Sequence, residues 1–211
     1  MELEGHVRGV LKTFGIRLEP VKTARHRANF REQLEEAGEH DPVLALLAET
    51  FAPVHRTSCV ATKAVEDELL AIGKESPLAR RLMTVPGVGT MVALGFIATV
   101  DDASRVRRAS DVGAFLGLTP RRYQSGEIDC SGRISKRGSE TTRKLLYEAA
   151  ISLISHVRRF SPLKSWAMRL AARTGLKKAA VATARKIAVI LHCIRVDGTE
   201  LKGKKMEEAK A

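Results

Sequence analysis

The stretch LMTVPGVGTMVALGFIATV, residues 82–100, decides the fold class. An apolar helix end runs into Pro86-Gly87-Val88-Gly89, and a second apolar run follows the turn. Glycine accepts backbone angles that a side chain resists, so Gly87 and Gly89 permit a tight turn between two helices. The pattern predicts a helix-hairpin-helix within a mainly α fold.

The same turn is a candidate contact to nucleic acid. The first backbone N–H groups of a helix have no partner inside the helix, so a phosphate oxygen can bind there. Gly87, Val88 and Gly89 are therefore predicted to bind DNA through its backbone, without reading its sequence. The alternative is a plain turn between two core helices.

The flanking sequence extends the helical prediction in both directions. N-cap side chains followed by proline predict helix starts at Asp41-Pro42, Ser76-Pro77 and Ser161-Pro162. Ser139 precedes a run in which Leu146 and other apolar residues recur at helical spacing, and residues 177–196 form a second such run. Gly175 is typical of a helix C-cap.

The composition changes near residue 75. Residues 20–75 are rich in acids and in charged helical runs, which predicts a helical hairpin or coiled-coil arm. Its turn is expected at residues 38–42, and Pro53 is expected to kink or interrupt its second helix. The predicted domains are the arm at 1–75, a helical domain at 76–200 and a charged tail at 201–211.

The charge of the chain indicates a polyanionic partner. The net charge is +12, and residues 105–144 carry ten basic against four acidic residues, a net +6. Such a field attracts nucleic acid. A membrane is a disfavoured partner for two reasons. No basic amphipathic run has a bulky aromatic face. No apolar run reaches the ~18 residues that span a bilayer.

The cysteines and histidines give no sign of a metal site or of disulfides. Cys59, Cys130 and Cys193 are far apart and odd in number, and the six histidines are scattered. This usage predicts a reducing, cytoplasmic setting.

Residues 118–144 concentrate the basic side chains around two Ser-Gly pairs. A basic Ser-Gly loop of this kind is suited to hold phosphates, and a nearby tyrosine can stack on a base. The predicted phosphate ligands are Arg121, Arg122, Arg133, Lys136 and Arg137. The alternative is a basic surface with no specific ligand.

Ser125 and Ser131 are the candidate nucleophiles in this stretch. A serine hydroxyl needs a base, a metal or dense positive charge to become reactive, and no histidine is nearby in the sequence. Flanking arginines can stabilise the charge of a pentacoordinate phosphorus. From the residues alone, either serine is more often a turn residue, and neither is preferred.

Three ordered segments, residues 82–100, 109–126 and 132–150, together resemble the C-terminal domain of one transposase family. These insertion-sequence transposases, the 110/116/902 group, pair a RuvC-like DEDD domain with a catalytic serine domain. Residues 5–18 also resemble the stretch that follows the RuvC-like domain.

The resemblance implies DNA transposition by a composite site. By its place in TPRRYQSG, Ser125 matches the nucleophile, although many relatives have a second serine where this chain has Gln124. Four acids of the RuvC-like domain bind Mg²⁺, so this cofactor is expected only together with that domain. DNA and a second copy bound through the arm are the implied partners, and a structured guide RNA is a further candidate because some members use one.

The sequence departs from the family at its start, where the RuvC-like domain is not found before residue 1. The expectation is a truncated transposase that is inactive alone, which leaves open whether the chain is an enzyme. The alternative function is a non-catalytic helix-hairpin-helix module that binds DNA without cutting it.

Overall fold

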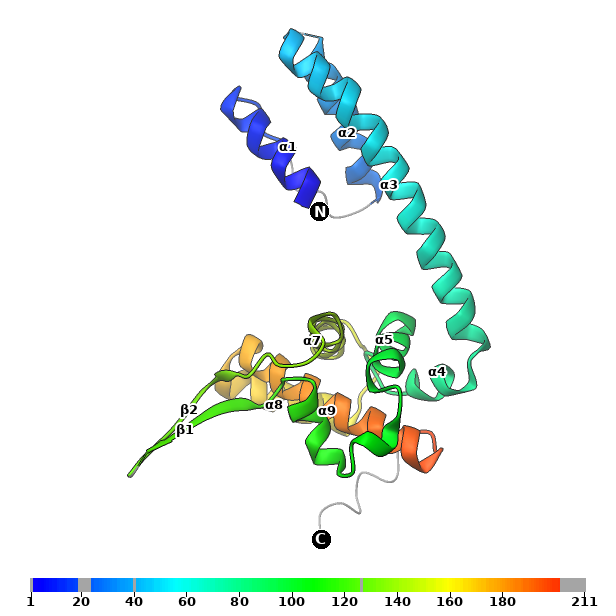
Figure 1. Cartoon of the computed structure of the whole chain (residues 1–211), viewed down its shortest axis with the longest axis vertical. Helices are drawn as coiled ribbons and strands as arrows, with labels where there is room; N and C mark the ends of the chain where they lie inside the picture. The colour runs from blue at the N-terminus through cyan, green and yellow to red at the C-terminus, as the bar shows by residue number, and fades with distance from the viewer. Residues whose placement is uncertain (1, 19–23, 40, 126, 202–211) are drawn as a thin grey trace. The chain divides into compact units, whose positions relative to one another are not determined.

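The computed structural model describes residues 2–18, 24–39, 41–125 and 127–201 (Figure 1). The chain is mainly helical, which confirms the predicted fold class. It divides into two compact units, Met1–Asp67 and Glu68–Ala211. The boundary predicted near residue 75 stays a prediction, and the predicted charged tail lies outside the described residues except for Leu201.

The first unit is built from α1 (Glu2–Thr13), α2 (Ala24–Gly38) and α3, whose full extent is Pro42–Glu75. The Asp41 carboxylate accepts a hydrogen bond from the Val43 N–H at 2.7 Å, which confirms the predicted helix start. The described part of the turn, Glu39 and Asp41, falls within the predicted range. The three helices share one apolar core, made of Val7, Leu11, Phe30, Leu34, Leu44, Ala48 and Phe51.

The interruption expected at Pro53 is not observed, because α3 runs through this residue. Proline removes one hydrogen bond from the helix interior. Phe51 and Ala52 are buried in this region, and tertiary packing of an apolar face contributes more to helix stability than one backbone bond.

A buried polar pair joins α1 to α3 in this unit. Glu4 Oε1 lies 2.8 Å from His55 Nε2, and both side chains are buried. Arg31 Nη1 lies 3.4 Å from the other ring nitrogen, Nδ1, and the ring stacks on Phe51. Because a guanidinium only donates, this contact favours the arrangement in which Nδ1 accepts from Arg31 and Nε2 donates to Glu4.

The second unit contains the following elements: α4 (Pro77–Leu82), α5 (Thr90–Val100), the short 3₁₀ helices η1 (Ala103–Arg105) and η2 (Ala109–Asp111), α6 (Val112–Phe115), β1 (Pro120–Ser125), β2 (Ile128–Ile134), α7 (Glu140–Ser155), α8 (Pro162–Thr174) and α9 (Leu176–Asp197). Helix α9 is central, because it packs against α4, α6, α7 and α8. Its buried residues include Ala184, Ile187, Ala188 and Leu191.

The predicted caps of this unit are confirmed. The hydroxyls of Ser76, Ser139 and Ser161 accept hydrogen bonds from backbone N–H groups at the starts of α4, α7 and α8. Gly175, with a φ of 85°, ends α8. These caps satisfy N–H groups that have no partner inside their helices.

The basic Ser-Gly loop is an antiparallel β-hairpin, which the sequence analysis did not predict. Tyr123 pairs with Cys130, Gln124 with Asp129 and Ser125 with Ile128. Every residue of β1 is exposed, and the hairpin extends away from the helices of its unit (Figure 1). Strands with two solvated faces lack the alternating apolar pattern by which a strand is recognised.

Replacement of Leu146 by alanine tests the core of the second unit. Leu146 is fully buried on α7, so Leu146→Ala is expected to lower the free energy of unfolding by about 2–5 kcal/mol. Met168→Ala on α8 is the control, because Met168 is 51% exposed and its loss should cost less than about 1 kcal/mol. Urea unfolding followed by circular dichroism measures both, and equal losses would contradict this core.

Candidate nucleic-acid interface

The root of the hairpin is held by two chain segments in direct backbone contact. Gly117 and Gly138 have positive φ angles of 67° and 80°. A Cβ on Gly117 would collide with the carbonyl of Arg137, and a Cβ on Gly138 with the carbonyl of Phe115. The Lys136 N–H donates to the Gly117 carbonyl at 3.1 Å across the same contact. Only glycine accepts both the backbone angle and the close approach.

Arg143 of α7 connects both segments of the root to the helical core. Its Nη1 donates to the carbonyl of Leu116 at 3.2 Å and to that of Arg137 at 3.1 Å. The guanidinium of Arg143 therefore has a structural role. A count of basic residues does not distinguish it from a side chain that is available to a ligand. The hairpin is attached to α7 through this guanidinium.

Ser125 lies at the end of β1 and is exposed. Successive residues of a strand point to opposite faces, so Ser125 shares one face of the hairpin with Tyr123, and Arg122 lies on the other. Ser131 pairs with Arg122 in the opposite strand, and Gly126 lies outside the described residues. The structure does not bring Arg122 to the face that carries Ser125.

Arg122 is engaged in a bidentate ion pair with Asp129. Its Nε and Nη2 lie 2.9 and 2.6 Å from the two carboxylate oxygens. The hydrogen bonds from Arg122 lower the pKa of Asp129, and those to Asp129 raise the pKa of Arg122. Both groups are charged at neutral pH and largely neutralise each other, so Arg122 offers a phosphate less attraction than an unpaired arginine.

The other predicted phosphate ligands gather at the root. The register shifts between Pro120 and Arg122, so Arg121 faces both Gly132 and Arg133. Arg121 Nη2 donates to the carbonyl of Ser135 at 3.3 Å. The exposed cations of the root are Arg121, Arg133, Lys136 and Arg137. Ser125 is four residues beyond Arg121, which is about 13 Å along β1 at ~3.3 Å per residue.

The three residues of the predicted phosphate turn lie in different surroundings. Gly87 has a φ of 88°, and a Cβ there would lie 2.6 Å from the carbonyl oxygen of Ala149 on α7. Val88 is buried, whereas Gly89 is exposed and caps α5, with no atom within 4 Å of an added Cβ. Gly87 and Val88 thus hold the turn against the core, and Gly89 faces open space. The helix-hairpin-helix itself stays a prediction.

The chemistry available elsewhere in the described residues is limited. They contain no group of three or more His, Cys, Asp or Glu side chains placed to hold a metal ion. Cys59, Cys130 and Cys193 are free, and burial, together with the charge of Asp197, raises the pKa of Cys193. No helix in the described ranges is long and apolar enough to cross a bilayer.

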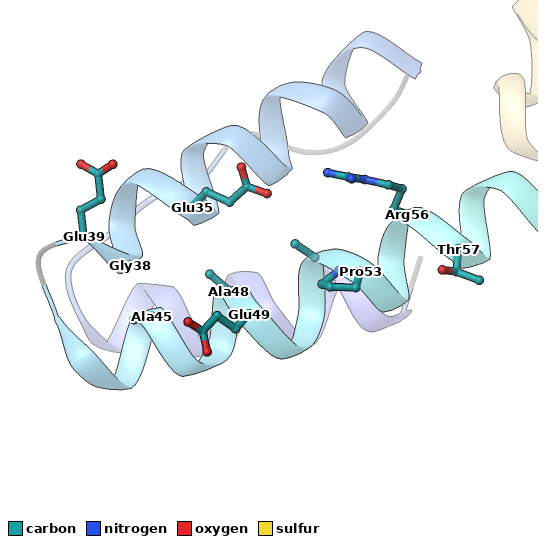
Figure 2. A pocket seen from close by; sticks show the side chains of 10 residues that line it. Glu35, Gly38, Glu39, Ala45, Ala48, Glu49, Pro53, Arg56 and Thr57 are labelled. Carbon is teal, nitrogen blue, oxygen red and sulfur yellow. The ribbon is translucent and has the colours of Figure 1, made fainter.

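A pocket of about 460 Å³ lies between α2 and α3 in the first unit (Figure 2). Small residues, including Gly38, Ala45 and Ala48, line it and let the two helices approach closely. Its charged lining residues are Glu35, Glu39, Glu49 and Arg56. The net charge of these four side chains is negative, opposite in sign to that of the hairpin.

Comparison with known proteins finds a family model that matches part of the second unit. Residues 79–164 match the model of the transposase IS116/IS110/IS902 family. The transposase for insertion sequence element IS1111A of Coxiella burnetii is 32% identical over 91% of this chain and 53% of its own length. A probable family 20 transposase of Pseudomonas aeruginosa is 31% identical over 89% of this chain and 56% of its own length.

A putative transposase of Sinorhizobium fredii, y4pF/y4sB, is 28% identical over 93% of this chain and 51% of its own length. The chain thus spans about half the length of these curated relatives, which is consistent with the predicted correspondence to a C-terminal part. The family model and the relatives agree, and the chain belongs to the transposase IS116/IS110/IS902 family.

Proposed function

We propose that the chain acts in DNA transposition as the serine-bearing part of a transposase, with Ser125 as the nucleophile. The observation that carries this proposal is the position of Ser125. It is exposed at the end of a strand that extends from a cationic root, in a chain of a transposase family. A DNA backbone that is bound at the root and continues along β1 can reach this hydroxyl.

The proposed step is a transesterification. The Ser125 oxygen forms a bond to phosphorus while the bond from phosphorus to the leaving strand breaks, so the product is a phosphoserine linkage. The hydroxyl proton passes to a base, and the leaving oxygen takes up a proton. None of the hydrogen bonds found in the described residues joins Ser125 to a base, so the base is expected in another domain or subunit.

The cations of the root are proposed to hold the DNA. Arg121, Arg133, Lys136 and Arg137 present guanidinium and ammonium groups to phosphate oxygens, which position a backbone without reading bases. The N-terminus of α5 at Gly89 adds backbone N–H groups that can bind a further phosphate. Arg122 contributes after its pair with Asp129 opens. A structured guide RNA remains a second candidate ligand for the same cations.

Helix α3 is the proposed contact to a second copy. Its side chains from Arg56 to Ile72 are nearly all exposed, although Val60, Val65, Leu70 and Ile72 are apolar. Val65 and Ile72 are seven residues apart and share one face of the helix, and exposed apolar side chains on one face are stabilised when another helix covers them. We therefore expect a homo-oligomer through the arm, as in a coiled coil.

A non-catalytic DNA-binding module is the second candidate function. It is favoured by the same observations that limit the first. None of the hydrogen bonds found in the described residues joins Ser125 to a base, and these residues contain no group of three or more His, Cys, Asp or Glu side chains placed to hold a metal ion. The resemblance assigns the magnesium-binding acids to another domain. We therefore expect strand cleavage only when an intact relative supplies them.

A covalent-adduct assay separates the two functions. With element-end DNA and an intact relative whose own serine is replaced, this chain is expected to form an adduct that survives denaturing electrophoresis. Ser125→Ala should abolish the adduct and retain DNA binding, whereas Ser131→Ala should retain both. No Ser125-dependent adduct, with or without the relative, would support the binding module instead.

Salt dependence tests the phosphate contacts of the root. For about six phosphate contacts, the plot of log affinity against log salt should have a slope near −5. Arg137→Gln should make the slope shallower by about 1, and Arg122→Gln should change it less, because Arg122 is paired with Asp129. Fluorescence anisotropy of a labelled duplex measures both, and equal changes would contradict the assignment of Arg137.

Gly89→Asp tests the N-terminus of α5. Aspartate is a preferred N-cap, and the φ of −99° at Gly89 accepts a side chain, so stability should be kept or increased. The carboxylate would occupy the free N–H groups and repel phosphate, which should weaken DNA binding by about three- to tenfold. Ala98→Asp places the same charge near the other end of α5 as the control, and equal affinities would contradict a phosphate site at Gly89.

Gly87→Ala should behave differently from Gly89→Asp. The added Cβ meets the backbone of Ala149 and is strained at positive φ, so the free energy of unfolding should fall by about 1–3 kcal/mol. Thermal unfolding measures this loss, and a neutral result would place the turn away from α7.

A further inference from the structure

The second unit has a cavity of about 500 Å³ between the hairpin root and helices α8 and α9. Its apolar wall comes from Leu118, Pro120, Ile134, Val181, Ala182 and Val189. Trp166 of α8 closes one side, and the cations Lys178, Arg185 and Lys186 of α9 line another. None of the functions derived above uses this cavity.

We infer that this cavity binds one unpaired nucleotide of a nucleic-acid strand, with its base against Trp166 and the apolar wall and its phosphate on the α9 cations. The inference rests on the proposed function only in taking nucleic acid as the ligand. It adds a site, a ligand class and a requirement for unpaired bases, which the phosphate contacts of the root do not have.

The charges of the cavity require an anionic occupant. Its lining includes three cationic residues and no Asp or Glu. No ion pair joins Lys178, Arg185 or Lys186 to an acid in the described part of the chain. Lys178 and Arg185 are seven residues apart, so they lie two turns apart on one face of α9. A phosphate bound between them would neutralise positive charge that no acidic side chain of the cavity lining balances.

Trp166 supplies the surface for a base. The ring is half-buried and packs against the core, and the Lys186 Nζ lies over it at 4.3 Å from its centroid. Its indole N–H has no hydrogen-bond partner among the described residues. A base that enters the cavity can contact the ring and accept this N–H.

Size and wall chemistry favour a nucleotide over an acidic peptide. A cavity of about 500 Å³ is within the range of small-ligand sites. A peptide would bring backbone N–H and C=O groups into a largely apolar wall, where they cost free energy without partners, whereas a base presents a face that needs none. In a duplex both faces of each base are stacked, so the occupant must be unpaired.

The position of the cavity relates it to Ser125. Pro120 begins β1 and Ile134 ends β2, and both line the cavity. A nucleotide held there lies at the root of the hairpin, about 17 Å along β1 from Ser125. It would fix which phosphate of the same strand reaches the hydroxyl.

Trp166 is the only tryptophan of the chain, so selectively excited tryptophan fluorescence of the whole chain reports on this cavity alone. The probes are a single-stranded oligothymidylate, an abasic strand of the same length, the corresponding duplex and an acidic peptide. Binding of each strand is followed separately by anisotropy of a label. Only the oligothymidylate is expected to quench Trp166 in a saturable way, while the abasic strand binds without quenching.

Two variants with a matched control locate the effect. Ala182→Leu fills the cavity without changing charge and should abolish the quenching with the helical circular dichroism unchanged. Lys178→Gln should weaken oligothymidylate binding about fivefold more than Lys177→Gln, which removes the same charge from an adjacent exposed residue outside the cavity. Ser125→Ala should leave the quenching intact. The nucleotide site and the assignment of Ser125 as the nucleophile can therefore be contradicted independently of each other.

Three results would overturn the inference. Equal quenching by the abasic strand would assign the contact to the sugar-phosphate backbone. Quenching by the acidic peptide and not by the strand would make the cavity a protein-docking site. Unchanged quenching in Ala182→Leu would place the base elsewhere.

Discussion

The second unit depends on one close contact between backbones at the root of its hairpin. A two-stranded hairpin is marginally stable by itself, so the strands that carry Ser125 need support from the helical core. Gly117 and Gly138 let the two segments of the root touch, and Arg143 bonds to carbonyls of both. The same contact places Pro120 and Ile134 beside α9, so the cavity wall depends on it too.

The structural features that could be predicted from the sequence are those in which the interacting residues lie close together along the chain. Ser139 caps α7 through the N–H of Thr142, three residues away, and Gly175 ends α8 next to its last residue. The apolar stripe of α9 repeats every three to four residues, so its buried face also follows from spacing. Local chemistry and periodicity therefore give the helices and the mainly α class.

The features that the sequence does not reveal depend on distant partners. Glu4 and His55 are 51 residues apart, and Trp166 and Lys186 are 20 apart, so neither pair shows in a local pattern. Charge counting treats Arg122 and Arg143 as equal to Arg137, although the first is paired with Asp129 and the second bonds to carbonyls. The motif locates Ser125, but only the structure shows that it lies on a strand and that Arg122 faces the other way.

The hairpin has a further property that follows from its two-stranded form. Each strand pairs only with the other within the described residues, so each has an outer edge of unpaired N–H and C=O groups. Such edges invite strands of other molecules and can start aggregation. The guanidinium groups along β1 and β2 oppose this by mutual repulsion between copies, so the positive charge that attracts polyanions also disfavours pairing of two hairpin edges.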